Sequence, residues 1–274
     1  NGNKGTFGKV LIYAGNHETF GAALLCAKSA FAAGAGMVKV LCPYSFRSFM
    51  LHELPEAMLT CYEQDDIDLL ETKIADDLTW CDTVIAGPGI GLSKQAKEIL
   101  QIMVKYAKVP MVLDADALNL LSEDEDLRHL LVSKNEELGR TVVLTPHMGE
   151  LGRLLKQTVK ELKEAPFDMA RKLSEIFHGI AVCKDARTVI CYKNREMYLN
   201  TSGNHGMATA GSGDVLAGLL GAYLALGGEP YHKTAAIAVY LHGKAGDEAA
   251  SKVGERALTA SQIIEGMISL QKGN

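Results

Sequence analysis

The stretch "KVLIYAG" (residues 9–15) is followed by "TFGAALLCAKSAFAAGAG" (19–36) and then by "MVKVLCP" (37–43). The first and third segments are short apolar runs that end in glycine or proline, which is typical of buried strands. The middle segment is rich in alanine and closes with glycine, as helices often do. This order predicts a parallel β–α–β unit whose strands are covered on both faces.

The same alternation of short apolar runs and longer helical patterns continues along the chain. Further strands are expected within 56–62, 82–91, 110–118, 140–150 and 180–200, and helices over 66–78, 93–107, 150–156, 167–179 and most of 213–270. No low-complexity linker or break in composition interrupts the pattern. We therefore expect a single α/β domain over residues 1–274, built on a mostly parallel central sheet.

The composition argues against some classes of function. The 274 residues are 47% hydrophobic with a net charge of -5, so no basic excess is present to neutralise a nucleic-acid backbone. The longest apolar run, 215–226, is too short and too rich in glycine to span a membrane. The six cysteines form no C-x-x-C motif, and no secretory signal is visible. Reduced, buried thiols in a cytoplasmic protein are expected.

Unusual residues concentrate in five short loops. Parallel sheets bind ligands at the edge where their strands end, and most of these loops follow an expected strand. The five loops are "AGNHETFGA" (14–22), "AGPGIG" (86–91), "LDADAL" (113–118), "TPHMGE" (145–150) and "MATAGSGD" (207–214). Parallel topology predicts that they meet on one edge of the sheet, although they are far apart in the sequence.

The "AGSGD" stretch (210–214) ends where an apolar helical pattern begins. Gly211 and Gly213 let the backbone approach a ligand closely, and the N–H groups of a helix start form a cradle for phosphate. Asp214 is then placed to accept a proton from a hydroxyl that attacks phosphorus. The alternative is an ordinary helix start, capped by Asp214 or Ser212.

The "TPHMGE" loop places His147 and Glu150 three residues apart at a helix start, so both can face the same edge. Both residues also suit simple capping, and Glu150 is equally suited to hold a metal–phosphate complex through water. Asp116 in "LDADAL" is expected to cap the following helix. Lys184 either pairs with a nucleotide phosphate or is solvated.

The ordered set of blocks resembles the ADP/ATP-dependent NAD(P)H-hydrate dehydratases of the ribokinase-like superfamily. The resemblance runs from about Gly5 to the last helix and is carried by "GAALLCAKSAFAAGAGMVKV", "LPEAM", "AGPGIG", "LDADAL", "TPHMGE" and "GNHGMATAGSGDVLAG". It implies a ribokinase-like three-layer α/β/α fold. It also implies a repair reaction, in which the hydroxyl of hydrated NADH or NADPH (the S-epimer) is phosphorylated from ADP or ATP and phosphate then leaves. Mg²⁺ and a homo-oligomer, a tetramer in relatives, are further expectations.

The resemblance also implies roles for individual residues. Asp214 would be the catalytic base, and it would contact the hydrated dinucleotide together with Ala22, Gly89 and His147. Glu150 corresponds to an acid that kinases of this fold use near Mg²⁺, which it would reach through water. The nucleotide would be bound by a segment like K-G-x-x-T and by the glycine loop, namely Lys184, Asp185, Ala186, Arg187, Thr188, Gly211, Ser212 and Gly213.

The sequence departs from the family pattern at three positions. Asp185 replaces the usual glycine of K-G-x-x-T and adds negative charge beside an expected phosphate site. His205 stands where proline is frequent, and Ala210 where glycine is frequent. The extra methyl group at Ala210 is small, so a slight shift of the loop is expected.

Two other functions are weighed against the dehydratase. A small-molecule kinase of the same fold, acting on a sugar or a vitamin precursor, would stop after phosphoryl transfer. Against it, His147 replaces the asparagine of sugar kinases, and Asp214 stands where thiazole and pyrimidine kinases commonly carry cysteine. The third possibility is a nucleotide-binding protein without catalysis, and the intact Gly213–Asp214 pair argues against it.

Overall fold

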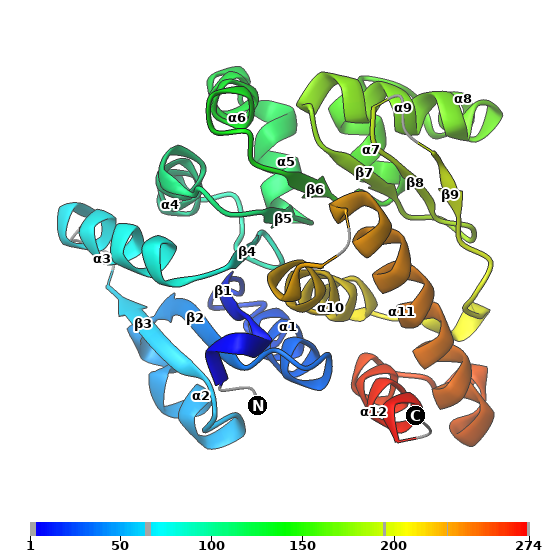
Figure 1. The fold of residues 1–274 in the computed structure, drawn as a ribbon, viewed down its shortest axis with the longest axis horizontal. Helices are drawn as coiled ribbons and strands as arrows, with labels where there is room; N and C mark the ends of the chain where they lie inside the picture. The colour runs from blue at the N-terminus through cyan, green and yellow to red at the C-terminus, as the bar shows by residue number, and fades with distance from the viewer. Residues whose placement is uncertain (1–3, 64–66, 194–195, 229, 273–274) are drawn as a thin grey trace.

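The structure is a computed structural model that describes residues 4–63, 67–193, 196–228 and 230–272. Its centre is a nine-stranded sheet in the order β3-β2-β1-β4-β5-β6-β7-β8-β9 (Figure 1). The strands are β1 (Lys9–Tyr13), β2 (Met37–Pro43), β3 (Met58–Tyr62), β4 (Thr83–Ala86), β5 (Met111–Leu113), β6 (Val142–Leu144), β7 (Ile180–Cys183), β8 (Val189–Cys191) and β9 (Tyr198–Leu199). Strands β1 to β7 pair in parallel, and β8 and β9 add antiparallel pairs.

Helices cover both faces of this sheet, which confirms the three-layer α/β/α architecture. One face carries α1 (Gly21–Ala32), α2 (Arg47–Glu53), α10 (Ser212–Leu226), α11 (Tyr231–Val253) and α12 (Ala260–Gln271). The other face carries α3 (Ile67–Trp80), α4 (Lys94–Tyr106), α5 (Asp116–Glu123), α6 (Glu125–Leu138), α7 (Met148–Leu155), α8 (Val159–Glu164) and α9 (Pro166–Phe177). Residue 66, the first of the helix expected over 66–78, and residues 194–195 lie outside the described residues.

The apolar strands are buried because each face of the sheet has its own core. In β1, Val10 and Ile12 pack into the core beneath α1 and α10, whereas Leu11 and Tyr13 pack into the core on the opposite face. Side chains of a strand alternate between its faces, so a strand covered on both sides is apolar throughout. All six cysteines are free thiols, and five of them are buried. Within the described residues, no helix combines the length and the apolarity needed to cross a membrane.

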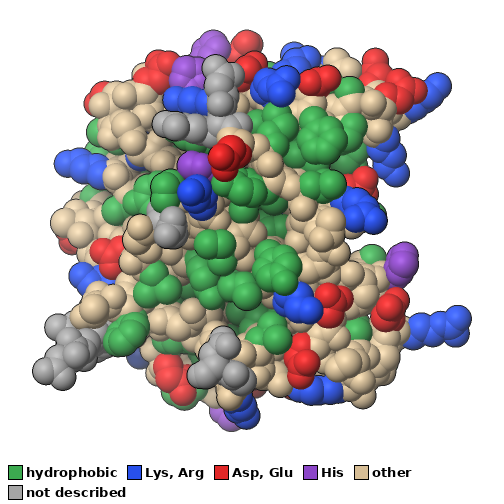
Figure 2. Space-filling model, turned by 45° about the vertical axis from the view of Figure 1, so that its right-hand side comes forward, with side chains coloured by type: hydrophobic (Ala, Val, Ile, Leu, Met, Phe, Trp, Pro, Cys, Tyr) green, Lys and Arg blue, Asp and Glu red, His purple; other side chains and the backbone are tan. Residues whose placement is uncertain are grey.

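The surface on the side of α8, β9 and α11 mixes charged and hydrophobic side chains. Figure 2 shows several hydrophobic groups across the middle of this face. Large exposed hydrophobic residues on its elements include Val159, Leu199, Ile237 and Tyr240.

Helices α1 and α10 pack almost backbone to backbone. A Cβ atom at Gly218 would lie only 2.3 Å from the Cys26 carbonyl oxygen. Along the same contact, Ser29 Oγ donates a hydrogen bond to the Val215 carbonyl at 2.6 Å, and Cys26 Sγ contacts the Asp214 carbonyl at 3.2 Å. This contact holds the first half of α10, which contains Asp214, against the middle of α1.

We expect Gly218→Ala to destabilise the protein, because its methyl group has no room and the two helices must separate. Overpacking of this kind costs about 1–3 kcal/mol, or roughly 2–4 °C in melting temperature per kcal/mol for a chain of this size. Gly21→Ala is the matched control, since a Cβ atom there meets nothing within 4 Å. Equal melting temperatures for the two variants would contradict the tight contact.

Candidate functional site

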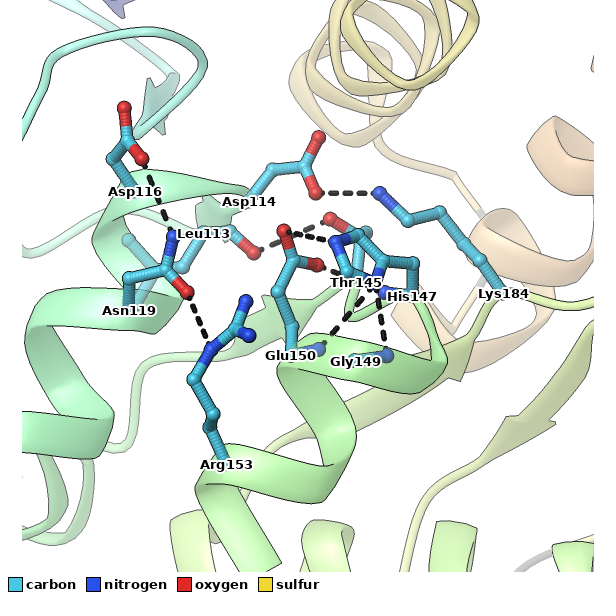
Figure 3. Close-up of polar contacts among 10 residues, drawn as sticks. All are labelled: Leu113, Asp114, Asp116, Asn119, Thr145, His147, Gly149, Glu150, Arg153 and Lys184. Carbon is cyan, nitrogen blue, oxygen red and sulfur yellow. Dashed lines mark hydrogen bonds and ion pairs between the residues drawn. The ribbon is translucent and has the colours of Figure 1, made fainter. Parts of the chain in front are cut away.

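An ion pair between Asp114 and Lys184 lies at the carboxyl edge of the sheet. Asp114 directly follows β5 and Lys184 directly follows β7, and Lys184 Nζ lies 2.7 Å from Asp114 Oδ1 (Figure 3). The main-chain N–H of Lys184 donates to the Pro146 carbonyl at 2.8 Å, which extends the parallel pairing of β6 and β7. Asp114 is only 1% exposed. Lys184 is therefore neither solvated nor isolated, and its charge is held beside a buried carboxylate.

The first turn of α10 lies directly over this ion pair. A Cβ atom at Gly213 would be 3.3 Å from Lys184 Nζ and 3.6 Å from Asp114 Oδ2. Glycine at this position therefore lets the main chain approach the two charges closely. The helix starts with Gly211 as its N-cap, in a left-handed conformation with φ 85°, and no side chain caps it. The expected alternative, in which Asp214 or Ser212 caps the helix, is wrong.

Asp214 lies in the first turn of α10 with its carboxylate unpaired. Among the described residues, this carboxylate accepts no hydrogen bond. Burial raises the pKa of Asp214 to about 7, the charges of Asp114 and Asp116 raise it as well, and the charge of Lys184 opposes them. A carboxylate with a pKa near neutrality is suited to exchange a proton at physiological pH.

Lys184 stays charged in this environment. Burial lowers the pKa of its ammonium group, but the charges of Asp114, Glu150 and Asp214 outweigh that effect and leave the pKa raised. The site therefore combines a fixed positive charge with the main-chain N–H groups at the start of α10. Both features attract anions such as phosphate.

His147 and Glu150 form a capping box at the start of α7. The ring atom Nδ1 of His147 accepts hydrogen bonds from the N–H groups of Gly149 (2.9 Å) and Glu150 (3.4 Å). Glu150 Oε2 accepts from the His147 N–H at 2.8 Å, and Oε1 lies 3.1 Å from Nε2. Because Nδ1 is an acceptor, the ring proton is placed on Nε2. Capping of α7 thus accounts in part for the conformations of the His147 and Glu150 side chains.

The capping box leaves His147 accessible and Glu150 buried. The side chain of His147 is 55% exposed, and burial together with Lys184 and Arg153 lowers its pKa, so the ring is neutral near pH 7. Burial also raises the pKa of Glu150, against the charge of Lys184. The exposed surface of the His147 ring is open to a ligand although both ring nitrogens have partners in the capping box, whereas Glu150 is buried.

The donor set near Glu150 fits Mg²⁺ only indirectly. The described residues contain no group of three or more His, Cys, Asp or Glu side chains that could hold a metal. Both oxygens of Glu150 are occupied by His147, so direct coordination would break the capping box. Mg²⁺ commonly keeps several waters and binds through one or two carboxylates and substrate phosphates. A contact from Glu150 through water is compatible with this arrangement.

The loops after β1 and β4 are joined to each other at the same edge. The Gly15 N–H donates to the Pro88 carbonyl at 2.7 Å, and Thr19 Oγ1 donates to the Gly89 carbonyl at 2.7 Å. Gly89 has φ +63° and packs against Thr19. These contacts place Gly89 close to the start of α1, where Ala22 is partly exposed.

Asp116 has a different role from the one expected. The N-cap of α5 is Ala115, and Asp116 is the first helical residue. Its Oδ2 accepts a hydrogen bond from the Gly91 N–H at 2.9 Å, so it holds the "AGPGIG" loop in place. Ala115 has φ 49° and ψ -115°, a strained conformation for a residue with a side chain. Asp114 and Asp116, on either side of Ala115, have separate partners, namely Lys184 and the Gly91 N–H.

The segment from Lys184 to Thr188 forms the turn between β7 and β8. Asp185, Ala186 and Arg187 are exposed and line a cavity of about 460 Å³ with apolar residues of α7, α8 and α9. The main chain of Thr188 accepts a hydrogen bond from the Asn200 N–H at 2.9 Å. The negative charge of Asp185 thus lies at the rim of this cavity. Lys184 is the residue of this turn that belongs to the ion pair with Asp114 under α10.

Two residues without an expected role also belong to this region. Asp114 was visible in "LDADAL", directly after a strand, but its partner lies 70 residues away in the sequence. His242 of α11 is buried and hydrogen-bonds to the main chain of Ser212, and burial lowers its pKa to about 4. Its Nε2 has no partner among the described residues. No spacing signal in the sequence connects His242 to the loop that it supports.

The fold and the site together are those of ribokinase-like proteins: a three-layer α/β/α domain with a lysine, an acid and free main-chain positions at one helix start. A ribokinase-like superfamily protein from Enterococcus faecalis is 26% identical and superimposes with a TM-score of 0.85, covering 100% of this chain and 89% of that one. The ADP/ATP-dependent NAD(P)H-hydrate dehydratase from Bacillus subtilis, co-crystallised with ATP/Mg²⁺, is 26% identical with a TM-score of 0.82, covering 100% and 92%.

The sequence comparisons identify the family. A family model described as NAD(P)H-hydrate dehydratase matches residues 10–269. The ADP-dependent (S)-NAD(P)H-hydrate dehydratase of Neisseria meningitidis is 35% identical over 265 residues, which cover 95% of this chain and 84% of that protein. A bifunctional NAD(P)H-hydrate repair enzyme of Moorella thermoacetica is 36% identical over 96% of this chain, which spans about half (49%) of that relative. The chain belongs to the NAD(P)H-hydrate dehydratase family.

The raised pKa of Asp214 predicts a pH-dependent loss of stability. Its ordinary pKa is 3.8 and its value in the folded protein is about 7. The folded chain therefore favours the protonated form, and the resulting penalty grows between pH 4 and 7 and is complete above pH 7. We expect Asp214→Asn to be more stable than the wild type at pH 8, by up to about 4 kcal/mol.

The measurement is thermal unfolding across pH 4–8. The stability that Asp214→Asn gains over the wild type should decrease as the pH falls towards 4. Asp168→Asn is the control, because its side chain is 69% exposed and, among the residues that the structure describes, forms an ion pair with Arg171 alone. A gain that does not depend on pH, or a loss of stability at pH 8, would contradict the partly buried, unpaired carboxylate.

Proposed function

We propose that this chain restores NADH or NADPH from the hydrated S-epimer, in a dehydration driven by ADP or ATP. The observation that supports it most is the unpaired, partly buried Asp214 beside Lys184 at the start of α10. Because the chain spans only half of its bifunctional relatives, the proposal concerns the activity of this domain. The chemistry requires a base for a hydroxyl and a cradle for the phosphate that it receives.

In this reaction, Asp214 accepts the proton of the hydroxyl on the hydrated nicotinamide ring. The hydroxyl oxygen then attacks the terminal phosphorus of the nucleotide, and the shortened nucleotide leaves. The carbon–oxygen bond of the phosphorylated ring breaks next, and inorganic phosphate departs with the bonding electrons. Loss of a proton from the neighbouring ring carbon restores the double bond. A carboxylate with a pKa of about 7 is a suitable base for the first step.

The nucleotide would lie between α10 and the β7–β8 turn. Gly213 lies beside the ammonium group of Lys184, so the main-chain N–H groups of Gly211 and Gly213 and this ammonium group would hold the transferring phosphate. The Ser212 N–H donates to the Thr209 carbonyl at 3.3 Å and would exchange that partner for the phosphate. Residues 185–188 would contact the remainder of the nucleotide. Bound Mg²⁺ would supply charge stabilisation for the phosphates, and Glu150 would orient its water ligands.

The hydrated dinucleotide would lie on the other side of Asp214, toward β1 and β4. Ala22 and Gly89 lie there on loops that are hydrogen-bonded to each other. The exposed, neutral ring of His147 would contact the substrate from the opposite side of the site. This placement keeps the substrate hydroxyl between Asp214 and the phosphate.

A small-molecule kinase would use the same cradle and the same base, but it would release a stable phosphate ester. Membership of the dehydratase family, over residues 10–269, favours elimination of the phosphate. We also propose that residues 1–274 act as one domain, because the sheet runs without interruption from β3 to β9. A homo-oligomer that covers part of the face in Figure 2 completes the proposal.

The direct test is the recovery of reduced-nicotinamide absorbance from hydrated NADH with ADP or ATP. We expect Asp214→Asn to retain nucleotide binding and to lose roughly 10²–10⁴-fold in rate, the usual contribution of a general base. Asp168→Asn should match the wild type. No recovery with either nucleotide, or a stable phosphorylated product, would refute the dehydratase. Near-normal turnover by Asp214→Asn would refute the role of the base.

The dependence of kcat/KM on pH gives an independent test. Since the base must be deprotonated, kcat/KM should fall below about pH 7. The charge of Asp114 raises the pKa of Asp214, and Asp114 also pairs with Lys184. We therefore expect Asp114→Asn to shift this acid limb to lower pH, whatever its effect on the maximal rate. An unchanged limb, or a shift to higher pH, would contradict the electrostatic account.

A further inference from the structure

Four aromatic rings gather at the carboxyl edge of β1 and β2. Phe20, which follows β1, stacks on Phe46, which follows β2, with ring centres 3.8 Å apart and an interplanar angle of 7°. Phe49 of α2 packs edge-on against Phe20 at 5.8 Å, and His17 lies 5.4 Å from Phe46. We call these four residues the aromatic shelf.

Only part of the aromatic shelf is buried in the core of the fold. Phe20 is buried and anchors the shelf in the core, but Phe49 is 44% exposed, His17 is exposed and Phe46 is only partly buried. Adjacent Arg47 is exposed in the first turn of α2, a turn without acidic residues, and no carboxylate of the described residues forms an ion pair with it. A cation at a helix N-terminus opposes the helix dipole. Open rings beside an unpaired cation indicate a ligand with a flat base and a negative charge.

The aromatic shelf is continuous with the expected substrate contacts. Its loop, residues 14–20, is hydrogen-bonded to Pro88 and Gly89. At the start of α1, which follows this loop, a Cβ atom at Gly21 meets nothing within 4 Å. Further along α1, Cys26 Sγ contacts the main-chain oxygen of Asp214 at 3.2 Å. In the sheet order, β1 and β2 are two and three strands from β5, the strand that precedes Asp114. Strands lie about 4.8 Å apart, so the shelf begins roughly 10–14 Å from the ion pair.

We propose that the aromatic shelf binds the adenosine half of the hydrated dinucleotide, with the purine stacked on its open rings and Arg47 near the adjoining phosphates. The inference rests on the proposed function, because it assumes that the hydrated nicotinamide half lies at Asp214. A dinucleotide carries its second base on a diphosphate linker. That base must therefore rest away from the reacting ring, and the side toward β7 is assigned to the nucleotide that donates phosphate.

The test compares two substrates that share the reacting ring. Hydrated NADH carries the adenosine half, and hydrated reduced nicotinamide mononucleotide lacks it. We expect Phe49→Ala to raise KM for hydrated NADH about 5- to 10-fold, the low end for one base stacked on one ring. Its kcat should stay within about twofold, as should both constants for the mononucleotide. Phe7→Ala is the matched control, because Phe7 is 50% exposed and precedes the amino end of β1, at the opposite edge of the sheet.

Two results would overturn the inference: an unchanged KM for hydrated NADH in Phe49→Ala, or an equal rise for both substrates. Isothermal titration of the wild type and Phe49→Ala with NADH and with reduced nicotinamide mononucleotide separates this inference from the proposed function. If the wild type turns over neither substrate, the dehydratase proposal fails. In that case a selective loss of NADH binding in Phe49→Ala would still support the shelf, and unchanged NADH binding would overturn it.

Discussion

The ion pair between Asp114 and Lys184 is the constraint on which the arrangement of the site depends. It joins the ends of β5 and β7 across β6, and the first turn of α10 lies directly on it. Without the lysine, the charges of buried Asp114 and partly buried Asp214 would repel each other without compensation, which is a costly arrangement. Without Asp114, the pKa of Asp214 would lose one of the two carboxylate charges that raise it.

The glycines around this pair follow from the same constraint. Gly213 lets α10 approach the charges, and at Gly87 a Cβ atom would lie 1.9 Å from the main-chain oxygen of Asp114. Main chain replaces side chains wherever a loop passes the carboxyl edge closely, so N–H groups remain available to a ligand. The close contact of α1 with α10 then aligns Asp214 with the loops that follow β1 and β4. The raised pKa of Asp214 is expected to lower stability above pH 7 at the residue that we propose as the base.

The sequence predicted the layers of this fold well because buried parallel strands have a simple sequence pattern. Runs such as 9–13 and 83–86 lack the alternation of polar and apolar residues that a half-buried strand shows, and glycine or proline marks their ends. The prediction that five loops share one edge was also correct, since it requires only parallel topology. The prediction that Asp116 caps its helix was wrong, as was the alternative that Asp214 caps α10. An acid at a helix start gives the same sequence pattern whether it caps the helix or binds a residue of another loop.

The sequence did not predict which side chains contact each other across the sheet. Lys184 and Asp114 are 70 residues apart, and the ring that stacks on Phe20 comes from a separate strand connection. Local patterns record which residues reach the edge, but not which of them meet there. The roles of Ala22, Gly89 and the 184–188 segment came from resemblance alone, and they stay predictions that the geometry supports.

The most direct test of the central claim is the pKa of Asp214 itself, measured by carboxyl ¹³C NMR across pH 4–9, with Asp214→Asn used to assign the signal. We expect a titration midpoint of about 7. A midpoint near the ordinary value of 3.8 would show that the carboxylate is neither buried nor opposed by Asp114, and would contradict the account.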